Sequence, residues 1–527
     1  MSDQVLIVDA LSAGVGRRTS SRDSIGCGPR AVAGVLEKQK VQCKIQRMED
    51  VLVIPKRLRR YNHVAISAMT MDLPAAVKFA KIWKHERPHG RMIIGGPIAF
   101  NPKPVLESLK PDLLVMGEGE ATLENLLEQD FFSENIDLSK IDGIAYLDHD
   151  DLFLTPSRSF ITSEEWSNDY KASTERIVDY KDYQAARVYV EVLRGCSNFG
   201  RTTLPLPDGR ECTNCGNCQS SNMNERLECP ENIPPGCGFC SVPNTWGPPR
   251  SRSAASIVNE IEELVASGVH RIVLEAPDFL DYQRGESPVT NPCAPPANND
   301  AIASLLDDLN AIPEINSGNV HLSIENIKAC LFADEIAGVL TKRLTSISPN
   351  IGLETGSDIH MAQIGKCGSA SDVVNAVKTA KKHGMFPYIY FIYGLPSETA
   401  ESVQASVKIM HEVSDAGAER IILYGFRPLP ESAFSHFSES SFHDPLSEPL
   451  RKTASRINRN KKDRYLGKTL CGIAAEPSWS RHGYTIVYPF GEGPIMTVRG
   501  GYSAGSLLML KITKVLSPGL LEAEVVK

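Results

Sequence analysis

Seven of the thirteen cysteines fall in one stretch of the chain, and their spacing is typical of metal ligands. They are Cys196, Cys212, Cys215, Cys218, Cys229, Cys237 and Cys240. In a chain that we interpret as lacking an export signal, thiolates two residues apart favour metal binding over disulfide pairing. Four cysteines can close the coordination of a metal or cluster, whereas three leave one iron open to a further ligand. A closed site and a reactive site are therefore expected.

The composition describes an ordinary globular protein, and the length predicts about three domains. Of the 527 residues, 42% are hydrophobic and 23% are charged. The net charge of −8 excludes a global attraction to nucleic acid. The first residues, MSDQVLIVDALSAG, predict a strand and not a signal peptide, because they carry an internal Asp and no basic segment. Without an apolar run of about eighteen residues, the chain is predicted to be cytoplasmic and to have no membrane contact.

Residues 1–130 alternate short apolar strands with amphipathic helices, a pattern that predicts a parallel, doubly wound α/β sheet. Strands are expected at 5–10, 64–67, 91–96 and 113–116, and helices at 28–40, 73–86, 105–109 and 120–128. Ligands bind outside the carboxyl ends of the strands in such sheets, where small and polar loops allow close approach. The loop residues in question are Ser67, Thr70, Gly95, Gly96, Gly117, Glu118 and Gly119. Taken singly, each loop also fits an ordinary Rossmann-like turn.

Residues 182–450 predict a β/α barrel or partial barrel, whose active residues would lie at the carboxyl ends of the strands. Strands are expected at 187–193, 271–276, 320–327, 348–358, 387–398 and 419–430, and helices at 254–268, 371–384 and 401–417. The first of these strands runs directly into Arg194-Gly195-Cys196. The second cysteine motif, Pro235-Gly236-Cys237-Gly238-Phe239-Cys240, follows a long insertion at 197–236.

This order of motifs resembles cobalamin-dependent radical S-adenosylmethionine (SAM) methyltransferases. The phrases IIGGP and VMGEGEATLENLL are similar to the cobalamin-binding domain of that family, which residues 1–165 would form as a Rossmann-like domain. The family's cluster loop has the spacing C-x3-C-x2-C with an aromatic residue before the last cysteine, and the long insertion departs from that spacing. The resemblance implies a 4Fe-4S cluster, SAM and cobalamin as cofactors. No lower axial ligand of cobalt is nominated, since the Asp-x-His-x-x-Gly motif does not follow the first strand.

Two partitions of the cysteines stay open. In the first, Cys196, Cys237 and Cys240 hold the radical SAM cluster; in the second, Cys229 replaces Cys196. We favour the first partition because Arg194-Gly195-Cys196 ends the expected first barrel strand. It leaves a self-contained set for an auxiliary site, which suits a second 4Fe-4S cluster and a zinc ion equally well. That set is Cys212, Cys215, Cys218 and Cys229.

The resemblance also implies where SAM binds. Phe239, Glu354 in GLETGSD and Gly394 in YFIYGLPSE match SAM-binding positions of the family. Glu275 or Asp278 would take the place of the strand-two motif, although EAPDF departs from the usual glycine pair, and Lys366 is a weaker candidate. No catalytic residue is assigned. Most of the scattered cysteines are expected to be buried free thiols: Cys27, Cys43, Cys293, Cys330, Cys367 and Cys471.

The C-terminal segment combines a basic run with short β-like stretches. Residues 451–465 hold seven Lys or Arg and one Asp, a composition typical of a solvated linker. Strands expected at 484–490, 495–499, 507–516 and 520–526 predict a small OB-like β-barrel over 464–527. This segment resembles the TRAM domain of tRNA-modifying methylthiotransferases. Residues 466–527 carry only six Lys or Arg against four Asp or Glu, which is sparse for an RNA-binding surface.

The resemblance implies a radical SAM C-methyltransferase that methylates an unactivated carbon, with a ferredoxin- or flavodoxin-type electron donor as partner. The domain order is similar to that of archaeal enzymes that C-methylate residues of methyl-coenzyme M reductase. A protein or peptide residue is therefore the predicted substrate, with a glutamine of that reductase as the leading candidate. The alternatives are a tRNA-modifying radical SAM enzyme, either methylase or methylthiotransferase, and a non-catalytic sensor that binds cobalamin and a cluster.

Overall fold

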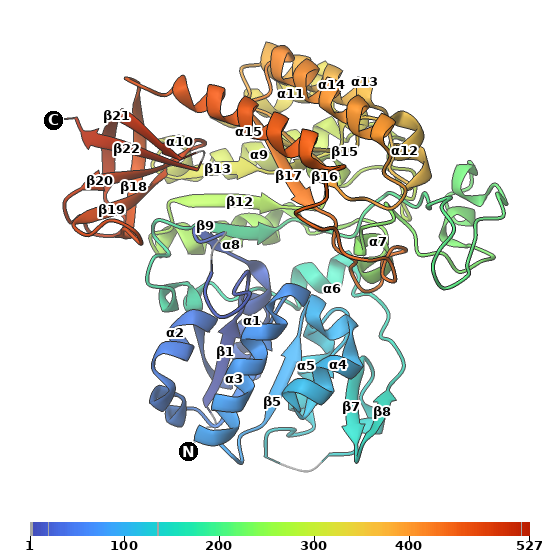
Figure 1. Cartoon of the computed structure of the whole chain (residues 1–527). Coiled ribbons are helices and arrows are strands. Elements are labelled where there is room, and N and C mark those ends of the chain that lie inside the picture. The colour runs from blue at the N-terminus through green and yellow to red at the C-terminus, as the bar shows by residue number, and fades with distance from the viewer. Residues whose placement is uncertain (1–3, 19–20, 134–135, 518, 527) are drawn as a thin grey trace. The chain divides into compact units, whose positions relative to one another are not determined.

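A seven-stranded sheet organises the first of the two units into which the chain divides, residues 1–190 with 252–269 (Figure 1). The computed structural model describes residues 4–18, 21–133, 136–517 and 519–526. The strand order is β3-β1-β4-β5-β6-β7-β8, and the first five of these strands pair in parallel. These five strands are β1 (Gln4–Asp9), β3 (Gln42–Arg47), β4 (His63–Ser67), β5 (Met92–Gly95) and β6 (Leu113–Val115).

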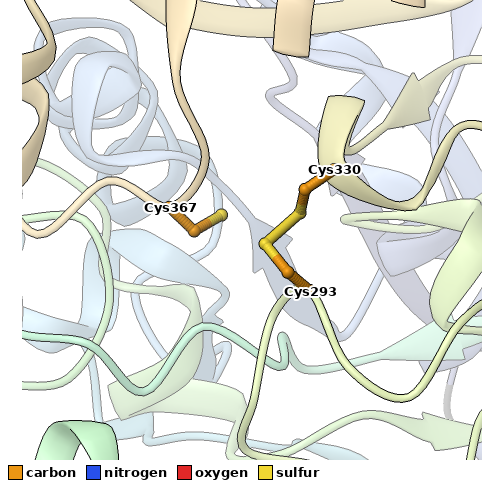
Figure 2. A group of neighbouring side chains, drawn as sticks. All are labelled: Cys293, Cys330 and Cys367. Atoms are coloured by element: carbon orange, nitrogen blue, oxygen red, sulfur yellow. A yellow bond between two sulfur atoms is a disulfide. The ribbon is translucent and has the colours of Figure 1, made fainter.

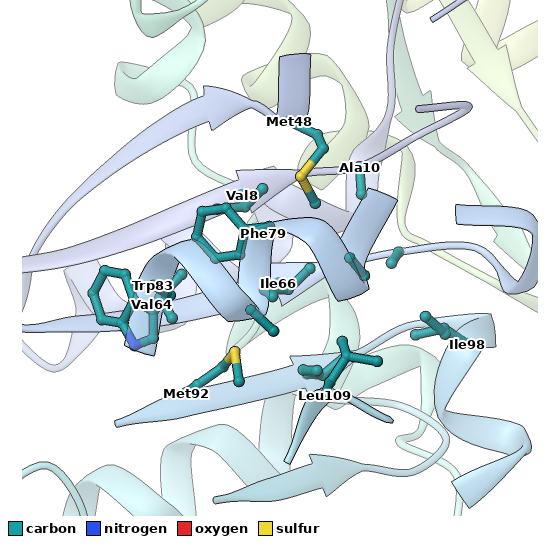
Figure 3. Close-up of a cluster of buried hydrophobic side chains, with 14 of the residues drawn as sticks. Val8, Ala10, Met48, Val64, Ile66, Phe79, Trp83, Met92, Ile98 and Leu109 are labelled. Carbon is teal, nitrogen blue, oxygen red and sulfur yellow. The ribbon is translucent and has the colours of Figure 1, made fainter. Parts of the chain in front are cut away.

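Helices cover both faces of this sheet, as the apolar strands require. Leu6 and Val8 of β1 share one buried core with Phe79 and Trp83 of α3 (Leu73–Glu86), part of which Figure 3 shows. That core also includes side chains of α2 (Met48–Val53) and α4 (Pro102–Leu109). On the other face, α1 (Cys27–Lys38) contacts β1, β3 and α5 (Glu120–Glu128).

One edge of the sheet differs from the purely parallel arrangement that the sequence predicts. β7 (Ile144–Asp148) and β8 (Asp151–Leu154) continue the sheet from β6 as antiparallel strands. The connection between β7 and β8 is too short for the crossover that a parallel pair needs, so only a hairpin can form there. The predicted parallel sheet of residues 1–130 agrees with the five parallel strands, and the antiparallel hairpin beyond residue 130 was not predicted.

A buried ion triad ties residues 252–269 to the first unit. Arg30 on α1 and Arg252, just before α8 (Ala254–Ala266), bind opposite oxygens of Glu260, at 2.8 and 2.7 Å. Arg30 also donates to the carbonyl of Tyr189 on β9 (Arg187–Glu191) at 2.6 Å. Burial opposes ionisation of Glu260, but the two arginine charges outweigh burial and lower the pKa of its carboxyl group below the ordinary value. The triad is thus held fully charged in the protein interior.

In the second unit, which comprises residues 191–251 and 270–527, parallel strands alternate with helices between residues 271 and 425. β12 pairs with β13, and a separate ladder has the order β14-β15-β16-β17, as the predicted β/α pattern requires. The strands are β12 (Arg271–Glu275), β13 (His321–Ile324), β14 (Asn326–Ile327), β15 (Asn350–Glu354), β16 (Tyr388–Tyr393) and β17 (Arg420–Gly425). The main helices are α9 (Asn299–Asn310), α11 (Asp334–Thr341), α13 (Ala370–Lys382) and α14 (Ala400–Ala416).

The basic segment 451–465 is part of a packed helix, and its interpretation as a solvated linker is wrong. It lies largely in α15 (Glu448–Asp463), which contacts α14 and β17. Leu450, Ala454 and Ile457 repeat at helical spacing and are buried, Lys461 continues that row, and the exposed charges occupy the other faces. Asn458 bonds both backbone groups of Ile421, at 2.9 and 2.7 Å, and so fixes α15 along the last strand. In the described ranges, neither α15 nor any other helix has the length and hydropathy that crossing a bilayer requires.

The C-terminal segment forms a closed five-stranded barrel, as predicted, with the order β18-β19-β20-β22-β21. Its apolar interior includes Val487, Met496, Leu510 and Leu521. The strands are β18 (Thr469–Pro477), β19 (Tyr484–Pro489), β20 (Ile495–Arg499), β21 (Leu507–Ser517) and β22 (Leu520–Val525). The first of them was not predicted. The domain bounds 1–165, 182–450 and 464–527 and the relation of the barrel to TRAM domains stay predictions.

His321, at the start of β13, makes stability depend on pH. Its ring bonds the carbonyl of Thr345 through Nε2 at 3.1 Å, and burial, assisted by the charge of Arg271, lowers its pKa to about 4. The unfolded chain therefore binds more protons than the folded chain between the ordinary histidine pKa of about 6.5 and pH 4. We expect protonation of His321 to remove about 3 kcal/mol of unfolding free energy as pH falls through that window.

Urea unfolding of wild type and His321→Asn between pH 7.5 and pH 4 measures this contribution. The wild type should lose more stability with falling pH than the variant does. His149→Asn is the matched control, because that side chain is 97% exposed. Parallel pH curves for wild type and His321→Asn would contradict the assignment.

Candidate cofactor and metal sites

A glycine fixes the loop that carries Cys196. Gly195 has φ of +85°, and a Cβ there would lie 2.3 Å from the carbonyl oxygen of Pro248. The Cys196 amide donates to the carbonyl of Gly247 at 3.1 Å. On the amino side, β10 (Leu193–Arg194) pairs antiparallel with β11 (Arg250–Ser251). The chain before Cys196 is therefore clamped against the chain that follows Cys240.

Asn198 brings together two cysteines that lie far apart in sequence. Its backbone N–H donates to Cys196 Sγ at 3.5 Å, and its side-chain Nδ2 donates to Cys237 Sγ at 3.3 Å. The Cys240 amide donates to the carbonyl of Cys237 at 2.8 Å, which places the third cysteine in the same turn. Cys229, the alternative ligand, instead packs against the apolar cluster around Phe434. This geometry favours the partition with Cys196, Cys237 and Cys240.

The three thiols of Cys196, Cys237 and Cys240 lie in surroundings that resist ionisation. Burial raises the pKa of Cys196 to about 12 and raises the pKa values of Cys237 and Cys240 above the ordinary value. The nearby charges of Lys328 and Lys366 act in the opposite direction on Cys196 and Cys237, respectively, but do not overcome burial. Such thiols ionise when a cationic centre binds them. The donor set therefore fits an iron–sulfur or metal centre.

A buried ionic network beside Cys196 was not predicted. Lys328 Nζ bonds Ser197 Oγ at 2.9 Å, Asp278 at 2.9 Å and Asp281 at 2.6 Å. The Asp278 carboxylate also accepts the backbone N–H of Leu280 at 3.1 Å, so its bonds lie within the network. Asp278 thus has the geometry of a positioning residue and not that of a free SAM contact. The sequence signal that could have predicted this network was the acidic pair Asp278 and Asp281, three residues apart and directly after a strand.

Glu354 and Lys366, both candidates from the sequence, form an ion pair of 3.1 Å at the carboxyl end of β15. Glu354 has φ of +69°, a left-handed conformation that costs about 1–3 kcal/mol and is concentrated at functional sites. A Cβ at Gly352 would lie 2.4 Å from the Glu354 carboxylate, so glycine leaves room for the pair. Backbone strain and a half-buried partner together hold this carboxylate in one orientation.

Two further predicted SAM positions are shaped by close packing. Gly394, directly after β16, has φ of +72°, and a Cβ there would lie 2.4 Å from Ser440 Cβ. Its amide donates to Glu398 Oε2 at 3.0 Å. Phe239 is half-buried against the same apolar cluster as Phe434. Both residues are held firmly in place, and their roles toward SAM stay predictions.

The cysteine-rich insertion is anchored by one arginine. Arg201 is only 7% exposed and donates to the carbonyls of Ile233, Arg226 and Leu227 at 2.9, 3.0 and 3.1 Å, and to Cys218 Sγ at 3.5 Å. In the described part of the chain, the insertion cysteines are not among the ligand groups whose atoms all lie within 4.8 Å of one another. The choice between a second cluster and zinc therefore stays a prediction. The insertion cysteines are Cys212, Cys215, Cys218 and Cys229.

Cys293, Cys330 and Cys367 lie together, and the prediction that such scattered cysteines are buried free thiols is wrong for them. Their Sγ atoms all lie within 4.8 Å of one another, and Cys293 and Cys330 are joined as a disulfide (Figure 2). None of the three is fully buried. They come from three separate loops of the β/α repeat, so their sequence positions carried no signal that they meet.

In the first unit, the predicted cobalamin contacts lie in three loops after β4, β5 and β6. The Ala68 amide donates to the carbonyl of Gly95 at 3.1 Å, and Thr70 Oγ1 donates to the carbonyl of Pro97 at 3.3 Å. Gly96 has φ of +88°, and a Cβ there would lie 2.8 Å from the Ala68 carbonyl oxygen. The loops that contain Ser67, Thr70, Gly95 and Gly96 are thus joined by direct bonds.

In the third loop, after β6, the side chain of Glu118 bonds to the protein itself and is not available to cobalamin as predicted. Glu118 is 7% exposed, and its carboxylate accepts the Ile161 amide at 2.8 Å. Its side chain therefore holds a neighbouring segment, while the backbone of Gly117-Glu118-Gly119 stays at the strand end. Gly117 has φ of +72°, and a Cβ placed at this residue would have no other atom within 4 Å. Open space therefore borders this loop.

Two exposed methionines beside these loops were missed by sequence reasoning. Met69 and Met71 are 39% and 49% exposed in the loop after β4. Asp72 fixes that loop by accepting the amides of Gly14 and Met69 at 2.8 and 3.0 Å. Exposed, polarizable side chains on a fixed loop suit a large ligand with apolar faces.

Comparison with known proteins agrees with this architecture. Residues 229–410 match the radical SAM superfamily. An uncharacterized protein of Methanocaldococcus jannaschii is 40% identical over 97% of this chain and 96% of its own length. An uncharacterized protein of Methanopyrus kandleri is 38% identical over 100% of this chain and 97% of its own length.

The fold is similar to that of TsrM from Kitasatospora setae, a radical S-adenosylmethionine methyltransferase solved with cobalamin and a [4Fe-4S] cluster. The TM-score is 0.60 at 15% identity, covering 82% of this chain and 77% of that chain. At this identity the likeness concerns the fold, and it confirms the radical SAM architecture that the cysteine and strand pattern predicts.

Proposed function

We propose that this chain, which belongs to the same family as the two full-length relatives from Methanocaldococcus jannaschii and Methanopyrus kandleri, is a cobalamin-dependent radical SAM C-methyltransferase. The observation that carries the proposal is the pair of bonds from Asn198 to Cys196 and Cys237. These bonds bring two of the three proposed cluster ligands together beside two half-buried lysines, next to the residues 229–410 that match the radical SAM superfamily. The TsrM-like fold supports the cobalamin part of the proposal.

In this function, Cys196, Cys237 and Cys240 bind the 4Fe-4S cluster, and Asn198 donates hydrogen bonds to two of their sulfurs. Such bonds tune the potential of a cluster. Glu354, Phe239 and Gly394 bind SAM. When bound, the cluster and SAM supply a deoxyadenosyl radical that abstracts hydrogen from carbon, and methylcobalamin supplies the methyl group. The loops after β4, β5 and β6 bind cobalamin through Ser67, Thr70, Gly95, Gly96 and the Gly117–Gly119 turn.

Lys328 and Lys366 balance the negative charge of the ligand set. Each lies within electrostatic range of a cluster cysteine, Lys328 of Cys196 and Lys366 of Cys237. Both amino groups are themselves held by carboxylates, so their positions are fixed before any cofactor binds. Preorganised charge of this kind stabilises a cluster without further rearrangement.

The substrate in this proposal is a protein or peptide residue, with a glutamine of methyl-coenzyme M reductase as the first candidate. It rests on the order of the domains and on the motif phrases that resemble enzymes acting on that reductase. The test uses full-length protein reconstituted anaerobically with iron, sulfide and cobalamin, then incubated with SAM, reductant and a synthetic peptide containing the glutamine. We expect 5′-deoxyadenosine, S-adenosylhomocysteine and a C-methylated peptide. Absence of both nucleosides with every substrate offered would favour the sensor alternative.

A tRNA-modifying enzyme is the second candidate, and one surface feature favours it. A groove of about 900 Å³ runs beside α15 and is lined by four basic side chains together with Phe442 and His443. The basic side chains are Arg451, Lys452, Arg456 and Arg459. If RNA is the substrate, Arg456→Glu/Arg459→Glu should abolish salt-dependent tRNA binding and leave 5′-deoxyadenosine formation without RNA unchanged. Modified peptide in the preceding test, together with no tRNA affinity, would exclude this candidate.

Glu354→Gln tests the proposed SAM site. Loss of a charge-assisted hydrogen bond of about 1.5–3 kcal/mol should weaken SAM binding roughly 10- to 150-fold. Equilibrium dialysis of the cluster-loaded protein with SAM measures this change directly. Glu419→Gln is the control, because that carboxylate accepts the Tyr465 hydroxyl at 2.9 Å near the C-terminal barrel. Equal SAM affinity in wild type and Glu354→Gln would remove Glu354 from the site.

A further inference from the structure

Three cysteines that the proposed function does not use converge on one point in the second unit. Cys293 lies in the loop after β12, Cys330 in the short helix Ala329–Leu331 after β14, and Cys367 after α12 (Asp358–Gln363). Figure 2 shows the three side chains pointing toward one another, with all Sγ atoms within 4.8 Å. A disulfide needs two thiols, whereas a third thiol beside both is the arrangement of a thiolate metal site.

We propose that Cys293, Cys330 and Cys367 bind one zinc ion through three thiolates, with the fourth coordination position open. Zinc–sulfur bonds of about 2.3 Å place two sulfurs of one tetrahedral ion about 3.8 Å apart. All three Sγ atoms lie within 4.8 Å of one another, so side-chain movements can reach that separation once the Cys293–Cys330 disulfide is reduced. Three sulfur ligands and one open position are typical of zinc sites that accept an exogenous ligand.

The chain positions two of these cysteines through one buried carboxylate. Arg284, bound to Asp281 at 2.7 Å, donates to the carbonyls of Asn291 and Pro295 at 2.9 and 2.6 Å, on either side of Cys293. The same Asp281 binds Lys328 at 2.6 Å, two residues before Cys330. The loops that carry Cys293 and Cys330 are therefore held relative to each other before a metal binds.

The third ligand, Cys367, approaches from another loop. A Cβ at Gly368, next to Cys367, would lie 3.9 Å from Cys330 Cβ, so the two loops are in direct contact. The three cysteines therefore meet from three separate loops before a metal binds.

The disulfide between Cys293 and Cys330 and the zinc site are alternative states of the same residues. A dithiol reductant such as dithiothreitol supplies two electrons and two protons, which convert the disulfide to two thiols while the reductant is oxidised. Binding of Zn²⁺ then displaces the thiol protons to solvent. Reduction therefore switches the group from a covalent cross-link to a metal site, and this inference stands without the proposed methyltransferase function.

The test uses full-length protein that is reduced, freed of iron and sulfide, and kept anaerobic. It is titrated with Zn²⁺ alone and, separately, with Co²⁺ alone, whose thiolate charge-transfer absorption reports sulfur ligands. We expect Cys367→Ser and Cys330→Ser each to bind one equivalent less than wild type and to lose part of the Co²⁺ absorption. Cys471→Ser, in the C-terminal barrel, is the matched control and should retain wild-type stoichiometry. Subtraction against this control removes any metal that the insertion cysteines bind.

Thiol alkylation of the wild-type protein gives a second measurement that does not depend on variants folding. Peptide mapping should find Cys293, Cys330 and Cys367 protected by Zn²⁺ and alkylated after a chelator is added, while Cys471 reacts equally in both states. The proposal is overturned if the Cys367→Ser and Cys330→Ser variants keep the wild-type metal content. It is equally overturned if Cys293 and Cys330 stay disulfide-bonded in reduced protein that has been saturated with zinc.

Discussion

Cys240→Ala and Cys196→Ala are each expected to abolish SAM cleavage in the reconstituted protein, whereas Cys215→Ala should leave it largely intact. Cys240 and Cys196 belong to the proposed cluster ligand set. The bonds of Asn198 and the turn from Cys237 to Cys240 bring these cysteines together in the second unit. Cys215 lies exposed in the insertion. Loss of one of three ligands removes the cluster or its open iron, so the expected effect is complete. 5′-Deoxyadenosine formation and iron content per chain are the measurements.

Cys229→Ala separates the two partitions of the cysteines. If the proposed partition is correct, this variant should cleave SAM and lose only the auxiliary centre. Loss of SAM cleavage in Cys229→Ala, together with its survival in Cys196→Ala, would replace our partition with the alternative one. In wild type, about eight irons per chain indicates two clusters, and about four irons with zinc that Cys215→Ala loses indicates the mixed arrangement.

Glu260→Ala is expected to destabilise the first unit by about 3–5 kcal/mol, because it removes the carboxylate that neutralises two buried arginines. Arg30 is fully buried and Arg252 is 2% exposed, so neither guanidinium can recover its lost partner in water. The lowered pKa of Glu260 adds a pH dependence. Its contribution is complete above the ordinary pKa of a glutamate, about 4.3, and is lost as pH falls through the lower folded value.

Chemical unfolding monitored by circular dichroism measures this effect. Glu262→Ala is the matched control, because that residue lies on the same helix with its side chain exposed. The triple variant Arg30→Met/Glu260→Leu/Arg252→Met should recover much of the lost stability, since removing a whole buried ion group is far less costly than removing one member. Equal stability of Glu260→Ala and Glu262→Ala would show that the triad contributes nothing.

Much of the fold could be predicted because its strongest elements follow local patterns. Helices α3 and α5 have the bounds that amphipathic periodicity gives, and β1 differs from its expected range by one residue at each end. α15 could not be recognised in the same way, because charged residues surround a narrow row of buried ones. The β7–β8 hairpin was missed because its short strands resemble loop sequence and gain their stability from pairing with β6.

The candidate site residues also differ in whether their neighbours in the sequence were enough to predict them. Cys237 and Cys240 could be predicted from adjacent residues, as could Gly394 and the loop glycines after β5 and β6. The bridge from Asn198 and the group of Cys293, Cys330 and Cys367 could not, since each depends on loops that meet only in the folded chain. Glu354 is an intermediate case, in which the residue was predicted and its left-handed backbone and lysine partner were not.

The hydrogen bond that joins the two ends of the insertion has a consequence for how this protein could have diversified. The amide of Gly236 donates to the carbonyl of Gly200 at 2.7 Å, so the insertion leaves and re-enters the chain at one point. Joining Gly200 directly to Gly236 would leave a short C-x5-C-x2-C motif, close to the compact spacing of the radical SAM family. Residues 201–235 can therefore change in length at small entropic cost, provided that Leu204, Leu206 and Ile233 stay packed against the cluster around Phe434.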